Sequence, residues 1–391
     1  MTNGGVTQGT LWFFSGAMFS VGMQMAETGA ALERMTSDLG LDPGQQGLLV
    51  SVRFIGGILV GLVLWAGHAR IRFRAILFWS LALVVMSGAL LLVPTYPAAL
   101  LLATLRGLSV GAIIPLSGMF GAAQQRWSPG LVASTVNAAV SAGLVLLSLV
   151  AVLLSTIPAI PWQAYWAVSS VIGIILLVLL PTVSFPGAPE AGFALGSSPP
   201  ESPITKASAA SATDWALAAA GLMLVGSESI LLGLIPAQSA AVSPLTFTGE
   251  FYALVLMTAI FVRRSLGTVL FRVATTSRVI TVSVAVIATG GILWSLIPGL
   301  APLSVFLSGL GTASFFPGLI AFVSETKPAK AGATIAAIGW TGGLGGTLLP
   351  AVTGFALSAG IPNRLTSGFV VCAAVGAYIL VRGSESLRRR E

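Results

Sequence analysis

Charged residues are scarce in this chain of 391 residues: only 8% of the positions are Asp, Glu, Lys or Arg, whereas 55% are hydrophobic. Soluble domains carry about a quarter charged residues, so water cannot be the solvent for most of this surface. Thiol and imidazole groups are almost absent, since the sequence has a single cysteine, Cys372, and a single histidine, His68. A disulfide framework within the chain is therefore impossible, and the sequence predicts no metal site and no cofactor.

Motifs for catalysis and for nucleotide binding are also missing. The sequence has no Ser–His or paired-Asp arrangement, and no Gly-x-x-x-x-Gly-Lys-Ser/Thr follows a strand. These absences argue against an enzyme and against an ATP-driven pump. The net charge of +7 does not predict a nucleic-acid partner, because the basic residues lie between apolar stretches rather than in one stripe.

What the chain does have is a series of long apolar stretches. A hydrocarbon core of about 30 Å needs about 20 apolar residues per helix, and lipid requires each segment to satisfy its own backbone hydrogen bonds. We therefore predict an all-α membrane protein with twelve transmembrane helices, at Leu11–Ala31, Gln46–Ala66, Ala75–Val93, Ala98–Ala122, Leu131–Leu154, Trp162–Leu180, Trp215–Pro236, Phe251–Val273, Val279–Leu296, Pro302–Val323, Ala333–Leu357 and Thr366–Val381.

A segment rich in Pro, Ser, Gly and Ala divides these helices into six and six. Its composition cannot bury a core, so residues 184–213 are predicted to be a cytoplasmic linker. The two six-helix bundles are then residues 1–183 and 214–391.

Basic residues predict the orientation, because cytoplasmic loops carry an excess of Lys and Arg. With the N-terminus inside, the outer loops hold only Arg34 and Arg364. Both termini are therefore expected in the cytoplasm of a multi-pass protein of the cell membrane, which we expect to be a monomer. The inner loops and the tail hold Arg70, Arg72, Arg74, Arg126, Lys206, Arg272, Arg278, Lys327, Lys330, Arg382, Arg388, Arg389 and Arg390.

An internal repeat supports the same division. Arg106-Gly-Leu-Ser-Val-Gly-Ala-Ile-Ile-Pro115 aligns with Ser308-Gly-Leu-Gly-Thr-Ala-Ser-Phe-Phe-Pro317. The same offset of 202 residues carries Gly143 onto Gly345. Together with the six-linker-six layout, the match predicts duplicated halves, as in transporters built from parallel repeats.

Over essentially its whole length the chain resembles the major facilitator superfamily of secondary transporters. Ser37-Asp-Leu-Gly-Leu-Asp-Pro-Gly-Gln-Gln-Gly-Leu-Leu49 resembles the start of that family's second helix, and Leu105-Arg-Gly107 followed by Gly111 resembles its fourth-helix motif. Trp162-Gln-Ala-Tyr-Trp166 lies where the family often has an aromatic-basic pair. The resemblance implies two six-helix halves with pseudo-symmetry and a small-molecule substrate.

Two departures from the family pattern narrow the expected function. The family's loop after helix two normally contains an aspartate, whereas Gly61–Arg74 keeps three arginines and has none. The fifth helix lacks the glycine-proline motif of drug–proton antiporters, which makes drug efflux a weaker alternative. The tenth and eleventh stretches, with Phe315-Phe-Pro317 and Gly339–Gly346, are similar to those of fucose-permease-type sugar–proton symporters.

Six ionisable residues fall inside the predicted spans: Glu27, Arg53, Arg106, Glu228, Arg263 and Arg264. Each costs about 2.5–3.5 kcal/mol if it faces lipid, so we expect them to face the bundle interior, a cavity or each other. Four arginines against two glutamates leave an excess of +2, which an anionic solute would complete.

Arg53 and Arg264 are the predicted substrate-binding residues. They lie in corresponding helices and share an Arg-x-x-Gly pattern, so both are expected to face the central pathway. Two guanidinium groups suit a carboxylate, nitrate or phosphate, and the disposition resembles that of nitrate–nitrite porters of the superfamily. Arg263 is an alternative to Arg264, since adjacent residues point about 100° apart on a helix.

Glu27 and Glu228 are the candidates for proton coupling, at similar depths of the first and seventh helices. Burial favours the protonated form of a carboxylic acid, which lets such a group carry a proton. The alternative is a permanent ion pair, Glu27–Arg53 or Glu228–Arg264, with no titration.

Arg106 is either a further element of proton transfer or a tether to carbonyls or a glutamate. Gln24, Asn137 and Trp340 are expected to line a cavity and contact the solute, or else to pack helices together.

The sequence therefore predicts alternating-access transport of a small polar, anionic solute, with protons as the coupling ion. Sugar–proton symport of the fucose-permease type, export of a drug or lipid, and a receptor that has lost transport are the alternatives.

Overall fold

The computed structural model describes residues 8–67, 73–122, 129–157, 160–183, 211–267, 270, 273–327 and 331–388. The predicted linker at 184–213 lies outside these residues except for its last three positions. His68, Arg70, Arg72, Arg126, Lys206, Arg272, Lys330, Arg389 and Arg390 also lie outside them.

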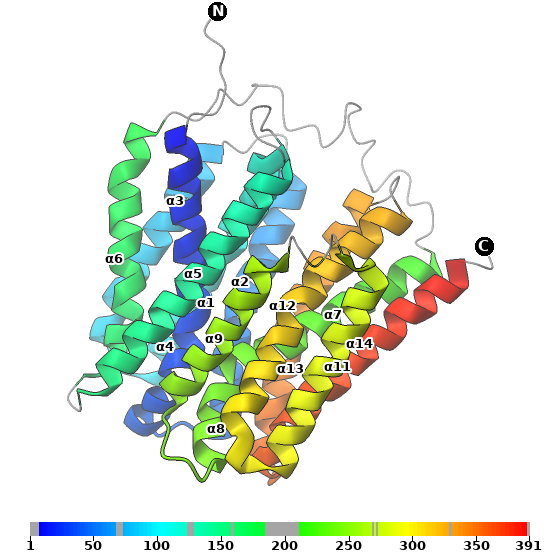
Figure 1. Cartoon of the computed structure of the whole chain (residues 1–391). Coiled ribbons are helices and arrows are strands. Elements are labelled where there is room, and N and C mark those ends of the chain that lie inside the picture. Colours follow the sequence, from blue (N-terminus) through cyan, green and yellow to red (C-terminus); the bar gives the residue numbers. More distant parts are fainter. Residues whose placement is uncertain are drawn as a thin grey trace, which may run out of the picture.

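The described chain is almost entirely helical, and its helices run alongside one another as a bundle (Figure 1). The first half consists of α1 (Gln8–Leu39), α2 (Pro43–Gly67), α3 (Phe73–Ser87), α4 (Tyr96–Ala122), α5 (Pro129–Ser155) and α6 (Gln163–Leu179). The second half consists of α7 (Ala212–Gly233), α8 (Ile235–Val242), α9 (Gly249–Ser265), α11 (Thr276–Leu296), α12 (Ala301–Thr326), α13 (Ala331–Ser358) and α14 (Thr366–Arg388). Short 3₁₀ turns at η1 (Gly88–Leu92) and η2 (Leu180–Thr182) extend α3 and α6.

Each predicted span coincides with a described helix, and the differences are local. The α1 helix continues to Leu39, so Arg34 lies within a helix and not in the outer loop where it was expected. The seventh span is interrupted at Leu234, beside Pro236, and resumes as α8 because proline cannot continue the hydrogen-bond ladder. The α9 helix ends at Ser265 instead of Val273.

Eight segments of the described structure are long and apolar enough to cross a membrane. They lie in α3 to α7, α11, α12 and α14. Glu27, Arg53 and Arg264 lie on α1, α2 and α9, and these three helices pack at the junction of the halves.

The two halves occupy different sides of the bundle, with α3, α5 and α6 on one side and α7, α11 and α14 on the other (Figure 1). They meet where α2 packs against α13 and where α5 packs against α9, while α1 contacts α7, α8 and α9.

Glycine contacts show that the halves are built alike. An added Cβ at Gly107 of α4 would lie 1.8 Å from the carbonyl oxygen of Arg53, and one at Gly309 of α12 would lie 2.8 Å from that of Leu256. These residues therefore permit the equivalent α4–α2 and α12–α9 approaches. Gly143 and Gly345 likewise face the carbonyl oxygens of Phe19 on α1 and Leu222 on α7, at 2.1 and 1.8 Å. The pairs of glycines that the repeat aligned thus make equivalent contacts.

Candidate functional site

A buried ion pair joins α1 to α4 inside the first half. Arg106 Nη1 lies 3.6 Å from Glu27 Oε1, and both side chains have no exposed surface. Glu27 therefore forms its ion pair with Arg106 and not with Arg53, the partner that the sequence had suggested. Desolvating two charges is costly unless hydrogen bonds satisfy their remaining atoms, so the partners that surround the pair matter.

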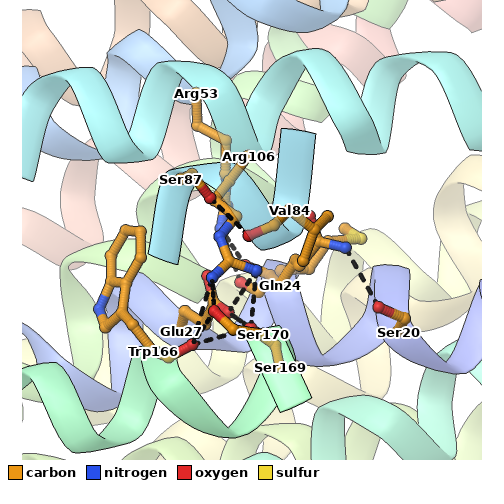
Figure 2. A network of polar contacts seen from close by, with 11 residues as sticks. Ser20, Gln24, Glu27, Arg53, Val84, Ser87, Arg106, Trp166, Ser169 and Ser170 are labelled. Carbon is orange, nitrogen blue, oxygen red and sulfur yellow. Dashed lines mark hydrogen bonds and ion pairs between the residues drawn. The ribbon is translucent and has the colours of Figure 1, made fainter. Parts of the chain in front are cut away.

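Those partners come from α6. Arg106 Nη1 donates to Ser169 Oγ at 2.9 Å, and Arg106 Nη2 donates to Ser170 Oγ at 2.6 Å and to the Trp166 carbonyl at 3.3 Å. Ser169 in turn donates to Glu27 Oε1. Figure 2 shows the Arg106 guanidinium beside Glu27, Ser169 and Ser170, so the tether described for Arg106 in the alternative interpretation is present.

Arg53 on α2 bonds to the backbone of α1 close in sequence to Glu27. Its Nη1 donates to the carbonyl oxygens of Gln24 at 3.2 Å and Met25 at 2.8 Å, on α1. The side chain is buried, yet its Nη2 has no hydrogen-bond partner, and the same is true of Glu27 Oε2. Both atoms could bond to a bound solute or a water molecule.

The second half supplies another ion pair at this junction. Arg264 Nη2 on α9 lies 3.3 Å from Glu228 Oε1 on α7, as the ion-pair interpretation of these residues predicted. The pair is more open than Glu27–Arg106, since the side chains are 17% and 13% exposed. No ion pair is recorded between Arg53 and either Glu27 or Glu228 in the described structure, so Arg53 interacts with these two carboxylates only at longer range.

Together these groups form a chain of alternating charge: Arg106, Glu27, Arg53, Glu228 and Arg264. We call it the charge chain. It contains three guanidinium groups and two carboxylates, an excess of +1 rather than the predicted +2, because Arg263 lies outside it and donates to Ser314 Oγ at 2.7 Å.

Arg53 and Arg264 are not equivalent in the repeat, contrary to what their shared Arg-x-x-Gly pattern suggested. Gly107 faces the carbonyl of Arg53, whereas its counterpart Gly309 faces that of Leu256. The counterpart of Arg53 is therefore Leu256, and Arg264 lies about two helical turns further along α9.

The remaining predicted contacts are dispersed. Gln24 is buried, its Nε2 donates to Ser20 Oγ at 3.3 Å, and its Oε1 has no hydrogen-bond partner. Asn137 is exposed on α5, and Trp340 is 47% exposed on α13. In the described structure, no recorded hydrogen bond or ion pair joins Asn137 or Trp340 to the charge chain.

A second polar cluster joins the halves at the end of the bundle where α1 ends and α2 begins, which we call the loop end. Glu33 on α1 accepts from the backbone N–H of Gly249, the first residue of α9. Tyr165 on α6 donates to Glu250 Oε1 at 3.1 Å. The side chain of Thr248 does not cap α9, so a carboxylate of the other half caps this helix.

Two further hydrogen bonds reinforce the loop end. Gln238 Nε2 on α8 donates to Gln46 Oε1 on α2 at 3.2 Å, and the Gly44 N–H donates to Ser358 Oγ on α13 at 2.8 Å. The α2 and α13 backbones also touch here, because a Cβ at Gly47 would lie 2.5 Å from the Pro350 carbonyl oxygen.

Sequence reasoning missed the residues that support both clusters. Ser169 and Ser170 are adjacent hydroxyls in the middle of an apolar span, which is a usable signal, since polar side chains inside a membrane seek partners. Glu33 and Glu250 were missed because they lie near helix ends, where the sequence predicted loops.

Comparisons with known proteins agree with this architecture. The sequence matches the Major Facilitator Superfamily over residues 12–350. The fold is similar to that of a D-xylose–proton symporter, with 17% identity, a TM-score of 0.73, and coverage of 95% of this chain and 96% of that one. It is also similar to the nucleoside transporter NupG, with 15% identity, a TM-score of 0.69, and coverage of 96% and 99%.

A third solved structure, the partially occluded inward-open xylose transporter XylE from E. coli, is 13% identical with a TM-score of 0.75 over 95% of this chain and 96% of that one. No curated protein sequence matches the chain. The family match covers most of the sequence, and the twelve-helix arrangement in two similar halves agrees with it. This multi-pass membrane protein belongs to the major facilitator superfamily of transporters.

Proposed function

We propose that the protein is a secondary active transporter that moves a small anionic solute by alternating access, coupled to protons. The observation that carries the proposal is the charge chain, in which ionisable side chains of both halves meet at the junction between them. Charges in a membrane interior are rarely retained without a function, and transporters bind their solutes near the interface of the repeats.

The excess positive charge supports an anionic solute. Arg53 is the central residue of the charge chain, and its Nη2, which has no partner, is available for a carboxylate or another oxyanion. Arg264 lies on the more open side, where an arriving anion could compete with Glu228 for the guanidinium. Gln24 provides a further polar atom beside Arg53.

Proton coupling is assigned to Glu27 and Glu228. Protonation of Glu228 would release Arg264 for the solute, and protonation of Glu27 would weaken its hold on Arg53 and Arg106. Carboxylic acids at such positions are typical proton carriers in transporters.

Alternating access is supported by the loop end, where hydrogen bonds join the halves. We infer a state closed at that end, with both termini in the cytoplasm of the cell as the basic residues predict. The chain would act as a monomer, and residues 184–213 would link bundles 1–183 and 214–391.

A neutral polyhydroxy solute is the second candidate. Glu27 Oε2 and Gln24 Oε1 are buried acceptors without partners, and hydroxyl groups would satisfy them. This candidate predicts binding that depends on Glu27 and Gln24 more than on Arg53.

A binding screen by thermal unfolding separates the two candidates. Purified protein would be heated with acetate, lactate, benzoate, nitrate and phosphate, and with xylose, fucose and uridine. A ligand at 100 times its Kd stabilises the folded state by about 2.7 kcal/mol. We expect an anion to stabilise the wild-type protein and Arg263→Gln but not Arg53→Gln. Arg263→Gln serves as the control because Arg263 bonds to Ser314 and does not belong to the charge chain. Stabilisation by sugars alone, unaffected by Arg53→Gln, would reject the anion.

A further inference from the structure

A groove of about 370 Å³ lies between the start of α3 and the end of α6, away from the charge chain. It is lined by Arg74, Phe78 and Trp79 on α3 and by Leu177, Leu180 and Pro181 on α6 and η2. Both helices pack against α1 or α4 of their own half. The groove is thus mostly apolar, with one cation at its end.

The cation is held in place over the end of α6. Arg74 is exposed, and its Nη2 donates to the carbonyl oxygens of Leu180 at 3.5 Å and Pro181 at 3.3 Å. Among the described residues, no acidic side chain forms an ion pair with Arg74. A guanidinium has five N–H donors, so Arg74 can also donate to an external acceptor.

The other half offers an internal comparison, since α11 and α14 pack together as α3 and α6 do. There the basic residue that spans the two helices is Arg382, whose Nη1 donates to Ser277 Oγ at 2.9 Å. Arg382 also pairs with Glu385 at 2.8 Å. In the second half an acidic residue of the same helix therefore balances the arginine, whereas no described acidic residue forms an ion pair with Arg74.

The aromatic side chains indicate the surroundings of the groove. Phe78 and Trp79 are 43% and 63% exposed and stack edge to face with their ring centroids 5.3 Å apart. An exposed tryptophan about a turn and a half from an arginine at the end of a transmembrane helix is typical of the boundary between headgroups and acyl chains.

We infer that this groove binds an anionic phospholipid. The phosphate would accept from Arg74, and one acyl chain would lie along Phe78 and Leu177. This site is independent of the proposed transport function, because none of its residues belongs to the charge chain or to the loop end.

Native mass spectrometry of the full chain tests the inference. The probes are phosphatidylglycerol and phosphatidylcholine with identical acyl chains, with inorganic phosphate as a third probe. A basic residue at a membrane surface contributes about fivefold in affinity for an anionic lipid. We expect about this preference for phosphatidylglycerol in the wild type, parity in Arg74→Gln, and no retention of inorganic phosphate.

Two further variants make the test specific. Arg278→Gln removes an exposed arginine from the first turn of α11 and should leave the preference unchanged. Leu177→Trp fills the groove without altering its charge and should displace the lipid. Equal retention of both lipids by the wild type, equal losses in Arg74→Gln and Arg278→Gln, unchanged retention in Leu177→Trp, or retention of inorganic phosphate would overturn the inference.

Discussion

Replacing Gly29 with alanine should open the loop end, because this glycine is a point of close approach between the halves. An added Cβ on α1 would lie 1.9 Å from the carbonyl oxygen of Leu232 on α7. Real Cβ contacts are essentially never shorter than 3.0 Å, so the two backbones must separate by about 1 Å before the side chain fits. Leu232 lies in the last turn of α7, and the clash involves its backbone oxygen rather than a side chain that could change rotamer.

The penalty can be given an order of magnitude. Overpacking of this kind costs about 1–3 kcal/mol, and here the cost falls on the state in which α1 and α7 are in contact. The equilibrium should therefore shift by about 5- to 150-fold toward the state that is open at the loop end.

Gly22→Ala is the matched control. Its added Cβ would also lie 1.9 Å from a carbonyl oxygen, that of Val140 on α5. Both of those helices belong to the first half, so this variant should lower the melting temperature without changing the arrangement of the halves.

Double electron–electron resonance would distinguish the two variants. Spin labels at Ser37→Cys and Thr246→Cys, both exposed at the loop end, would be placed in a Cys372→Ser background. We expect a population at longer distance in Gly29→Ala and a distribution like that of the parent in Gly22→Ala. The same distribution in both variants would refute the assignment of Gly29 to a moving interface.

Two further predictions concern the buried polar groups. Arg106→Met leaves Glu27 as a buried charge without its partner, so it should lower the free energy of unfolding by about 3–5 kcal/mol. Arg264→Met should lower it less, because the Arg264–Glu228 ion pair is partly exposed. Chemical unfolding in micelles measures both losses, and equal losses would contradict the distinction. Tyr165→Phe removes the donor to buried Glu250 and should destabilise the state closed at the loop end by about 1–3 kcal/mol. The same spin-label pair would report this as a shift toward longer distances. An unchanged distance distribution would contradict a role for this hydrogen bond in closing the loop end.

Much of the fold could be predicted from the sequence because lipid imposes simple rules. The apolar stretches gave the twelve spans, and the Gly107–Gly309 and Gly143–Gly345 pairs correctly indicated equivalent contacts in the two halves. The errors came where local chemistry overrides hydropathy. The continuation of α1 through Arg34 is one example, since polar residues at a helix end look like a loop in a hydropathy profile.

The sequence predicted one of the two ion pairs, Glu228–Arg264, but not the other, because Glu27 pairs with Arg106 and not with Arg53. Four of the six ionisable residues in the predicted spans form the ion pairs Arg106–Glu27 and Arg264–Glu228, since charges in an apolar interior must find one another. Which arginine pairs with Glu27 depends on how α4 and α6 approach α1. Ser169 and Ser170 of α6 bond to Arg106 and support its pairing with Glu27, although they lie far from both residues in the sequence. Spacing along one helix cannot predict such contacts between helices.

Uptake into proteoliposomes tests the central claim, that the charge chain is the transport site. Wild-type protein, Arg53→Gln and the control Arg263→Gln would be reconstituted and supplied with the labelled anion that the thermal screen identifies, with and without a pH gradient that is alkaline inside. The account predicts uptake that the gradient stimulates in wild type and in Arg263→Gln, and uptake at the level of empty vesicles in Arg53→Gln. Anion uptake by Arg53→Gln at the wild-type rate would contradict it.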